Sequence, residues 1–434
     1  MWSVDGAALP PDVTGTRFPK MVRMRQTFER PQVDNIAATV AEQVSACGLG
    51  ERVHAGESVA ITAGSRGIAN MAEIVRALVD AVKDVGAKPF VFPAMGSHGG
   101  ATAEGQAAVL HHYGITEATM GCPIRSGAEA VEVGRLGDGT PVYLDRYAND
   151  ADHLVVVNRV KPHTGFHAAV ESGLCKMLAI GVGKQVGASY YHRAFLRQDF
   201  EETILGAANF LIDSGRVAMG LAIVENGYDE TAMLVGLAPD EIVTVEKKLI
   251  QQARDLMGSI PFREVDCLIV DYIGKDVSGA GMDSNITGRK FREGEGSSSV
   301  HAPEVLRIFV RDLTEKSQGN ATGIGAADVT TRRVVEKIDR GATYMNALTA
   351  KVTAGCKIPP YFDTDAVALA WVLNTVGLTE PEDTKVVRIR STLDLEEMLV
   401  SEALIDEAAS LVHATLLGDA EDMEFSDDGA LREF

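Results

Sequence analysis

The strongest constraint on the fold is a repeated order of apolar strand, small-residue loop and amphipathic helix. Residues 58–65 (SVAITAGS) form a short apolar run that ends in a glycine-containing turn, and residues 88–100 repeat this arrangement. Apolar side chains recur every three or four residues in 35–48 and 68–85, which predicts two helices. Residues 153–160 (HLVVVNRV) predict another strand. This order predicts a mostly parallel sheet covered by helices on its faces.

Three loops follow predicted strands of this sheet, at residues 63–67, 95–101 and 158–176. In open parallel sheets, ligands bind beyond the carboxyl ends of the strands. We therefore expect the three loops to line one common rim.

The second half of the chain repeats the α/β pattern. A long helix is predicted over 239–257, and a second unit is predicted to begin with the strand at 266–273 and to include a late strand at 385–390. We predict an α/β protein of two α/β domains with mostly parallel sheets. The predicted parts are an N-terminal catalytic and cofactor-binding domain, a connecting helix, a C-terminal domain and an acidic tail, at residues 1–238, 239–258, 259–418 and 419–434.

Two shorter segments carry turn signals. Residues 135–144 predict a hairpin that turns at Asp138-Gly139. Residues 294–299 (GEGSSS) predict a mobile loop.

Composition restricts the partners of the chain. With 41 Lys and Arg against 61 Asp and Glu, the formal charge is −20, which disfavours attraction to nucleic acid or to an anionic membrane. The five cysteines are scattered without CxxC spacing, which argues against a disulfide framework. The first 20 residues lack a signal-peptide pattern, and no window reaches the roughly 20 apolar residues that span a bilayer. We expect a cytoplasmic protein.

The densest group of chemically competent residues lies between Asn158 and His192, with three histidines and three lysines. This segment could be an ordinary polar surface loop. However, His163 and His98 both follow predicted strands of one sheet, so they could act as an acid/base pair on opposite faces of a substrate. Arg66, after the first strand, could bind a carboxylate with two hydrogen bonds, or it could be an exposed charge.

Other patterns in this segment are weaker. His163 and His167 could bind zinc, but no convincing third ligand is nearby. Residues 181–184 (GVGK) lack the full phosphate-loop pattern, and no strand-associated GxGxxG predicts NAD binding. Cys175 could be a nucleophile, although a buried thiol is the simpler interpretation.

These motifs resemble the nickel-dependent lactate racemase family. The similar residues are Pro162-His163, the run Ser172-Gly173-Leu174-Cys175-Lys176, His192, and the earlier Ser65-Arg66 and Gly96-Ser97-His98. The resemblance implies two α/β domains with the active site in the cleft between them. It also implies a racemase or epimerase of a 2-hydroxyacid that uses a nickel-pincer nucleotide, made by cofactor-synthesis enzymes in the host.

The resemblance assigns roles to individual residues. It implies that Lys176 anchors the cofactor beside Ser172 and Gly173, and that His192 is the nickel ligand. It further implies that His98 and His163 are the acid/base histidines, and that the arginine after Ser65, Arg66, binds the substrate carboxylate.

The segment that follows His163 is longer than in lactate racemases, so His167 remains an alternative second base. In the second domain, Lys275 is the best candidate for a substrate-binding lysine, with Asp283 and Asn285 as possible polar contacts. These differences favour a substrate other than lactate. The competing functions are a metal-dependent hydrolase or lyase that uses the same histidines, and a cofactor-binding protein without turnover.

Overall fold

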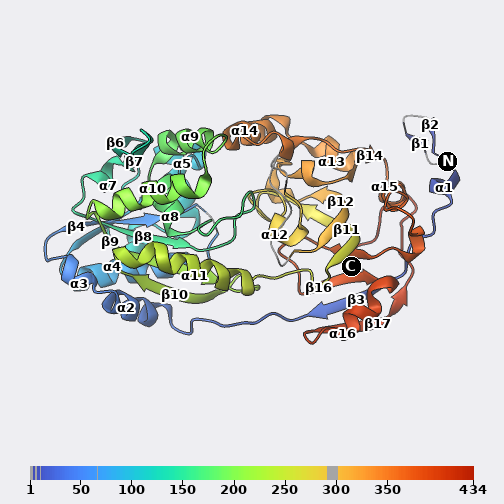
Figure 1. Ribbon diagram of the computed structural model, residues 1–434, viewed down its shortest axis with the longest axis horizontal. Helices are drawn as coiled ribbons and strands as arrows, with labels where there is room; N and C mark the ends of the chain where they lie inside the picture. The colour runs from blue at the N-terminus through green and yellow to red at the C-terminus, as the bar shows by residue number, and fades with distance from the viewer. Residues whose placement is uncertain (1–2, 5–6, 10, 66, 291–301) are drawn as a thin grey trace. The chain divides into compact units, whose positions relative to one another are not determined.

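The computed structural model describes residues 3–4, 7–9, 11–65, 67–290 and 302–434. The chain divides into two compact units (Figure 1). We call residues 29–163 and 167–257 the five-stranded unit, and residues 1–28, 164–166 and 258–434 the eight-stranded unit, after the main sheet of each. The loop predicted at 294–299 lies outside the described residues.

The five-stranded unit contains the parallel sheet that the sequence predicted. Its strand order is β10-β9-β8-β4-β5, and only β10 runs antiparallel to its neighbour. The bounds are β4 Ser58–Ala63, β5 Lys88–Pro93, β8 His153–Arg159, β9 Val217–Glu225 and β10 Thr231–Leu237. Strand β4 therefore lies between β8 and β5 and pairs with both.

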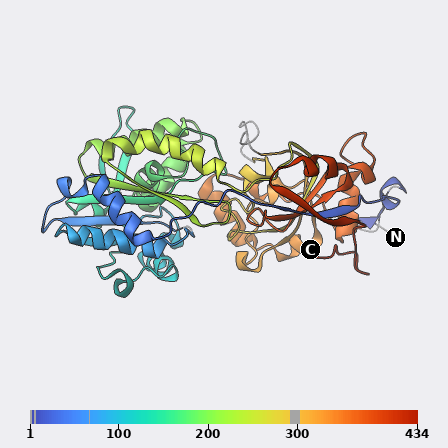
Figure 2. The same ribbon diagram turned by 90° about the horizontal axis from the view of Figure 1, so that it is seen from below.

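Alternating side chains of these strands divide the core into two layers. Leu154 and Val156 of β8 pack with α10 and α11, whereas Val155 and Val157 pack with α2 and α4. Figure 2 shows the blue helices of the second layer and the yellow-green α11 on opposite sides of the strands. The bounds are α2 Ile36–Ala46, α4 Met71–Asp84, α10 Phe200–Asp213 and α11 Ile242–Asp255. Burial on both faces explains why these strands are apolar throughout.

Shorter elements complete this unit. The hairpin predicted around Asp138-Gly139 is present as β6 and β7. The bounds are β6 Ala130–Arg135, β7 Pro141–Asp145, α3 Leu49–Arg52, α5 Ala103–His112, α6 Glu117–Met120, α7 Arg146–Asn149, α8 Leu174–Lys176, the π-helical turn Met177–Gly181 and α9 Lys184–Ala194.

The eight-stranded unit has a mixed sheet in the order β14-β13-β12-β11-β15-β16-β3-β17. The first five strands are parallel, and the last three pair antiparallel. The strand bounds are β3 Met21–Gln26, β11 Glu264–Ile273, β12 Glu304–Leu313, β13 Val329–Thr331, β14 Tyr361–Phe362, β15 Val386–Ile389, β16 Glu397–Ser401 and β17 Ala414–Glu421. The helix bounds are α12 Ser284–Thr287, α13 Arg332–Lys337, α14 Arg340–Ala350, α15 Asp365–Leu373 and α16 Ile405–Ser410. The mixed α/β class with mostly parallel sheets is therefore confirmed.

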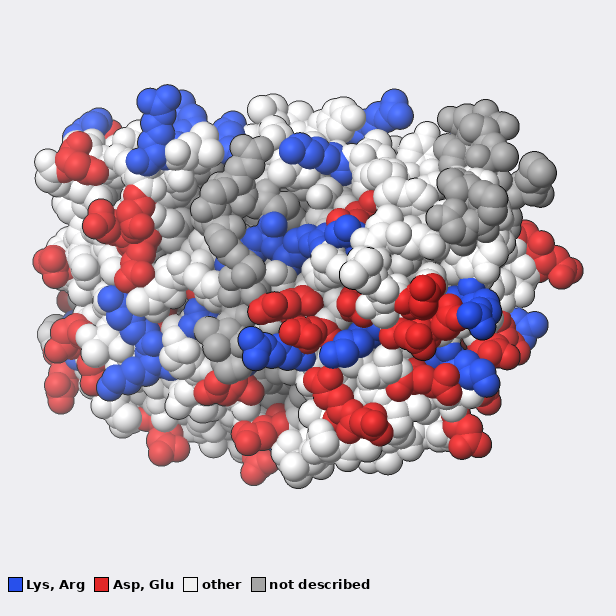
Figure 3. All heavy atoms as spheres, turned by 45° about the vertical axis from the view of Figure 1, so that its right-hand side comes forward, with Lys and Arg blue, Asp and Glu red and all other residues white. Residues whose placement is uncertain are grey.

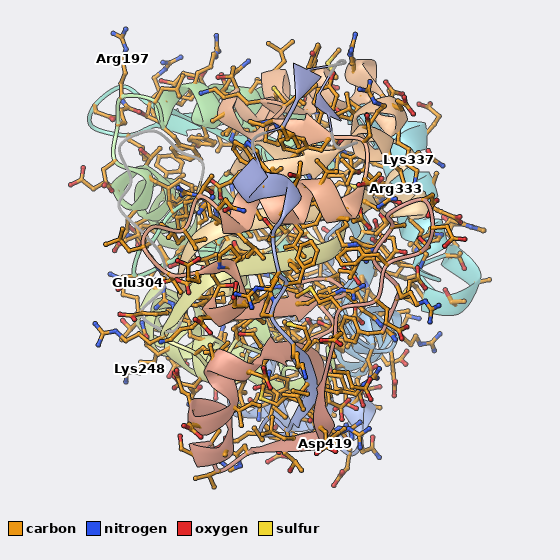
Figure 4. All side chains as sticks on the ribbon, turned by 90° about the vertical axis from the view of Figure 1, so that its right-hand side faces the viewer. Arg197, Lys248, Glu304, Arg333, Lys337 and Asp419 are labelled. Carbon is orange, nitrogen blue, oxygen red and sulfur yellow. The ribbon has the colours of Figure 1, made fainter. Side chains whose placement is uncertain are left out.

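A buried ion network crosses the parallel part of this sheet. Arg311 of β12 pairs with Asp271 of β11 at 2.8 Å and with Asp365 of α15 at 2.7 Å. Arg333 of α13 also reaches Asp365, and it lies beside Lys337 in Figure 4. Asp271 has a second cationic partner in Arg388, as Asp365 has in Arg333, so the network ties α13 and α15 to the sheet.

Two parts of the predicted domain division differ from the observed units. The predicted N-terminal domain contains residues 21–26, but β3 pairs with β16 and β17 of the eight-stranded unit. The predicted acidic tail at 419–434 is also integrated into this unit. Its Leu431 is buried and its N–H donates to Asp365 at 2.9 Å. Pairing partners so distant in the chain leave no local pattern.

The surface carries charges of both signs. Acidic and basic side chains are interspersed on the face shown in Figure 3. Every helix in the described ranges is too short or too polar to span a bilayer.

Candidate functional site

The carboxyl ends of β4, β5 and β8 lie side by side, as the strand order requires. The loops after β4 and β5 contact each other through Ser65 and His98, and both reach the helical turn that follows the β8 loop. The N–H of Gly96, after β5, donates to the carbonyl of Gly181 at 3.2 Å, and a Cβ added at Gly64, after β4, would lie 3.4 Å from Met177 Cε. The expected common rim is therefore present in the five-stranded unit.

His98 follows β5 on a short, tightly packed loop. Its Nδ1 shares a hydrogen bond with the Ser65 hydroxyl, and the Tyr113 hydroxyl donates to the Ser65 carbonyl at 3.0 Å. The next residue, Gly99, has φ +62°, and an added Cβ would lie 2.7 Å from the backbone nitrogen of Gln106. Only glycine fits there without moving the loop.

The buried side chain of Lys184 supports this loop. Lys184 Nζ donates to the Pro93 carbonyl at 2.6 Å and to Gln106 Oε1 at 3.0 Å, and it lies 2.9 Å from Asp145 Oδ2. Gln106 in turn donates to the carbonyls of Gly96 and His98. Burial lowers the pKa of Lys184 and raises the pKa of Asp145, and each charge opposes the effect on its partner. Lys184 therefore supports the His98 loop through these contacts. Because its ammonium group is buried among them, the structure does not favour phosphate binding by residues 181–184.

The loop after β8 is held by backbone hydrogen bonds at its base and by the carboxylate of Glu171. Lys161 and Ser172 exchange backbone hydrogen bonds of 2.8 and 3.2 Å. Inside this closure, Glu171 accepts hydrogen bonds from the backbone N–H of His163, from His167 Nδ1 and from Arg254. The half-buried His163 ring lies 6.2 Å from the Phe200 ring, between centroids.

Gly173 is required by the packing of the protein itself. The place of its missing Cβ is taken by the carboxylate of Glu246, from α11. Glu246 is fully buried and accepts a hydrogen bond from the N–H of Cys175 at 2.9 Å. Burial raises the pKa of Glu246 to about 7. It also raises the pKa of the Cys175 thiol, which is inaccessible, so Cys175 is unsuited to be a nucleophile.

Lys176 and His192 lie on consecutive helical segments. Lys176 ends α8, and the buried π-helical turn Met177–Gly181 follows it directly. His192 is half-buried near the end of α9, with its ring 6.2 Å from that of Phe195. π-Helical turns occur frequently at functional sites. The apolar turn holds Lys176 at the edge of the core, as the sequence predicted.

Two predicted substrate-binding residues cannot be placed at this rim. Arg66 lies outside the described residues. Lys275 lies in the eight-stranded unit, after β11, where its Nζ donates to the Gly279 carbonyl at 2.6 Å. In the same unit, Asp283 caps α12 and accepts from the Asn285 side chain at 2.9 Å.

Sequence reasoning missed the supporting residues Asp145, Glu171 and Glu246. One signal was available for Glu246, because it falls on the apolar stripe of the predicted helix with Ile242, Leu249 and Ala253. A carboxylate on such a stripe needs a buried hydrogen-bond partner.

Comparison with protein families identifies the segment that carries the rim. Residues 14–203 match the lactate racemase N-terminal domain. The resemblance predicted from the motifs is therefore confirmed for this part of the chain.

Two solved structures are similar at low identity. The lactate racemase apoprotein from Thermoanaerobacterium thermosaccharolyticum is 12% identical, with 89% of this chain and 86% of that chain covered and a TM-score of 0.44. A protein from Thermotoga maritima is 13% identical, with 76% and 84% covered and a TM-score of 0.47. A search of the curated proteins returned no match.

Proposed function

We propose that this protein is a racemase or epimerase of a 2-hydroxyacid that uses a nickel-pincer nucleotide. One observation carries the proposal. Within the segment that matches the lactate racemase N-terminal domain, His98 follows β5 and Lys176 follows β8, the two strands on either side of β4, and the His98 loop contacts the helical turn directly after Lys176. The proposed site residues are those that the motifs identified.

The described residues fit such a cofactor. The half-buried Lys176 would anchor it, and the half-buried imidazole of His192 would be a nickel ligand. Among the described residues, no group of three or more His, Cys, Asp or Glu side chains could hold a metal ion. A cofactor that brings most of its own metal ligands needs no such group.

The reaction needs proton transfer at the substrate hydroxyl. Direct removal of the α-hydrogen as a proton is unfavourable, because the adjacent carboxylate already carries negative charge. When bound, the cofactor would supply reversible hydride acceptance. His98 would take the hydroxyl proton, which leaves a neutral ketone, and His163 would return a proton when the opposite enantiomer forms. Arg66 would bind the substrate carboxylate, and Lys275 stays a predicted substrate-binding residue of the other unit.

The deciding experiment is metal and intact-mass analysis of protein co-expressed with the cofactor-synthesis enzymes. We expect about one nickel per chain, with either an adduct at Lys176 or a nucleotide released on denaturation. Enantiopure 2-hydroxyacids would then be screened for racemisation. Zinc or no metal, together with no nucleotide, would overturn the proposal.

A matched pair of variants separates an enzyme from a cofactor carrier. His98→Ala should lose turnover and keep nickel and nucleotide, whereas Lys176→Ala should lose the cofactor. Normal racemisation by His98→Ala would remove the role assigned to His98.

The hydrolase alternative gains no support from the geometry. It requires His98, His163 and His167 to bind one metal ion, and these three side chains do not form such a group among the residues that the structure describes. Hydrolysis or elimination with zinc alone, without a nucleotide, would restore this alternative.

A further inference from the structure

The loop after β8 carries both histidines that could be the second base, His163 and His167. It also contains Glu171, whose side chain is 0% exposed. A carboxylate so deeply buried is strongly destabilising unless hydrogen bonds and an opposite charge compensate it. The hydrogen-bond partners of Glu171 therefore indicate which parts of this loop its carboxylate holds in place.

Glu171 divides its two oxygens between different partners. Oε2 accepts the hydrogen bond from the backbone N–H of His163. Oε1 accepts from the N–H of Ala168 and from His167 Nδ1, both at 3.2 Å, and from Arg254. One side chain thus fixes the backbone at both ends of the stretch from 163 to 168.

The position of Arg254 decides how the His167 contact should be interpreted. A carboxylate that orients a catalytic histidine normally increases its basicity. Here the Arg254 guanidinium, with a side chain only 12% exposed, pairs with the same oxygen that His167 contacts, and its Nη2 lies 3.4 Å from His167 Nδ1. The carboxylate charge is therefore already compensated. The His167 side chain is also 36% exposed, so it lies at the solvent edge of the cluster.

We propose that Glu171 is a positioning residue that holds the backbone of His163 in place for catalysis, with His167 and Arg254 as parts of the clamp. The racemase part of this inference rests on the proposed function. It assigns the second acid/base role to His163, and it predicts that His167 is replaceable.

The clamp itself can be tested without the cofactor. Hydrogen–deuterium exchange of the full chain would compare wild type with Glu171→Ala and Glu171→Gln. Amides of residues 161–173 should exchange at least about 10-fold faster in Glu171→Ala, and by an intermediate factor in Glu171→Gln, which keeps one acceptor oxygen. Amides of β9 and β10 should be unchanged. Unchanged exchange across 161–173 would overturn the clamp.

The assignment of roles is tested in the cofactor-loaded enzyme with matched histidine variants. We expect His163→Gln to lower kcat by at least about 1000-fold and His167→Gln by less than about 5-fold. Glu171→Ala should lower kcat by about 100-fold with a smaller change in KM, and Glu171→Gln should recover part of the loss. Abolished turnover in His167→Gln with retained turnover in His163→Gln would overturn the assignment.

These arms distinguish failure of the clamp from failure of the proposed function. If wild type shows no racemisation, the exchange measurement still decides whether Glu171 holds the loop. If Glu171→Ala fails to fold, Glu171→Gln and Arg254→Met provide the same comparison. Faster exchange confined to 161–173 supports the clamp in either variant, and unchanged exchange in both contradicts it.

Discussion

The loops after β5 and β8 both present a candidate catalytic histidine, but they are held by groups of opposite polarity. In the β5 loop, buried donors satisfy backbone carbonyls, because Lys184 and Gln106 donate to Pro93, Gly96 and His98. In the β8 loop, carboxylates satisfy backbone N–H groups. Glu171 accepts from His163 and Ala168, Glu201 accepts from Ala169 at 2.8 Å, and Glu246 accepts from Cys175.

The charged group that supports each loop has a partner of opposite charge. Glu171 of the β8 loop is compensated by Arg254, in a segment from 161 to 176 that also carries Lys161, His163, His167 and Lys176. The β5 loop carries only His98 as an ionisable group in 94–101, and its support is a lysine that is itself neutralised by Asp145. The histidines after β5 and β8, two strands separated by β4, are thus held through different backbone groups, carbonyls in the β5 loop and N–H groups in the β8 loop.

Removing the Lys184 cation, which supports the β5 loop, should cause the largest loss of stability. Lys184→Met leaves Asp145 buried without its partner, so we expect the free energy of unfolding to fall by about 3–5 kcal/mol. Urea denaturation measures this loss. Lys248→Met, on the exposed surface of α11, is the matched control (Figure 4). A loss below about 1 kcal/mol would show that the ion pair does not support the loop.

Replacing Glu246, the buried carboxyl group next to the β8 loop, should have the next largest effect on stability. The size of this effect should depend on pH. Because the pKa of Glu246 is raised to about 7, the folded state keeps its proton while the unfolded chain releases it at the ordinary pKa of 4.5. Wild-type stability from this group therefore falls as pH rises from about 4.5 to 7, and is flat above. Each pKa unit corresponds to about 1.4 kcal/mol.

Glu246→Gln lacks this titration. Its stability relative to wild type should rise by about 1–3 kcal/mol between pH 5 and pH 8, as measured by chemical denaturation. Glu42→Gln, on the exposed face of α2, controls for the loss of a carboxylate. A difference that stays constant with pH would contradict the raised pKa.

Two adjacent glycines test how tightly the β5 loop is packed. Gly99 and Gly100 have similar φ values of +62° and +65°, but only at Gly99 would a Cβ meet backbone atoms. Both alanine variants should lose about 1 kcal/mol from the left-handed conformation. Gly99→Ala should lose about 1–2 kcal/mol more, because the loop must shift. Thermal unfolding of the pair measures the difference, and equal losses would show that the loop adapts.

The smallest effect is expected from removing the Ser65 hydroxyl, which shares a hydrogen bond with the His98 ring. Ser65→Ala should lower kcat of the cofactor-loaded enzyme about 10-fold, equivalent to about 1.4 kcal/mol, because the imidazole loses its orienting partner. Ser65→Thr keeps the hydroxyl and should retain activity. Nitrogen-15 NMR of the His98 ring offers a measure independent of turnover. A ring tautomer and kcat both unchanged in Ser65→Ala would remove the positioning role.

Much of this fold and part of this site were predictable from local patterns. The apolar runs and helical periodicities in residues 35–160 anticipated β4, β5, β8, α2 and α4. They also placed His98 and Lys176 after strands of one sheet, β5 and β8, which lie on either side of β4. The assignments of His98, His163, Lys176, His192, Ser172, Gly173, Arg66 and Lys275 as site residues stay predictions until the experiments above are done.

Local patterns were enough to predict β4, β5 and β8 and the polar residues that follow them, because both depend on neighbours within a few positions. Contacts between distant residues settle that β3 joins a sheet with β16, and that Lys184, Glu171 and Glu246 are buried. Burial of a charge is favourable only where distant residues supply its partners, such as Asp145 for Lys184 and Arg254 for Glu171. Those partners lie 39 and 83 positions away, beyond the reach of any local pattern.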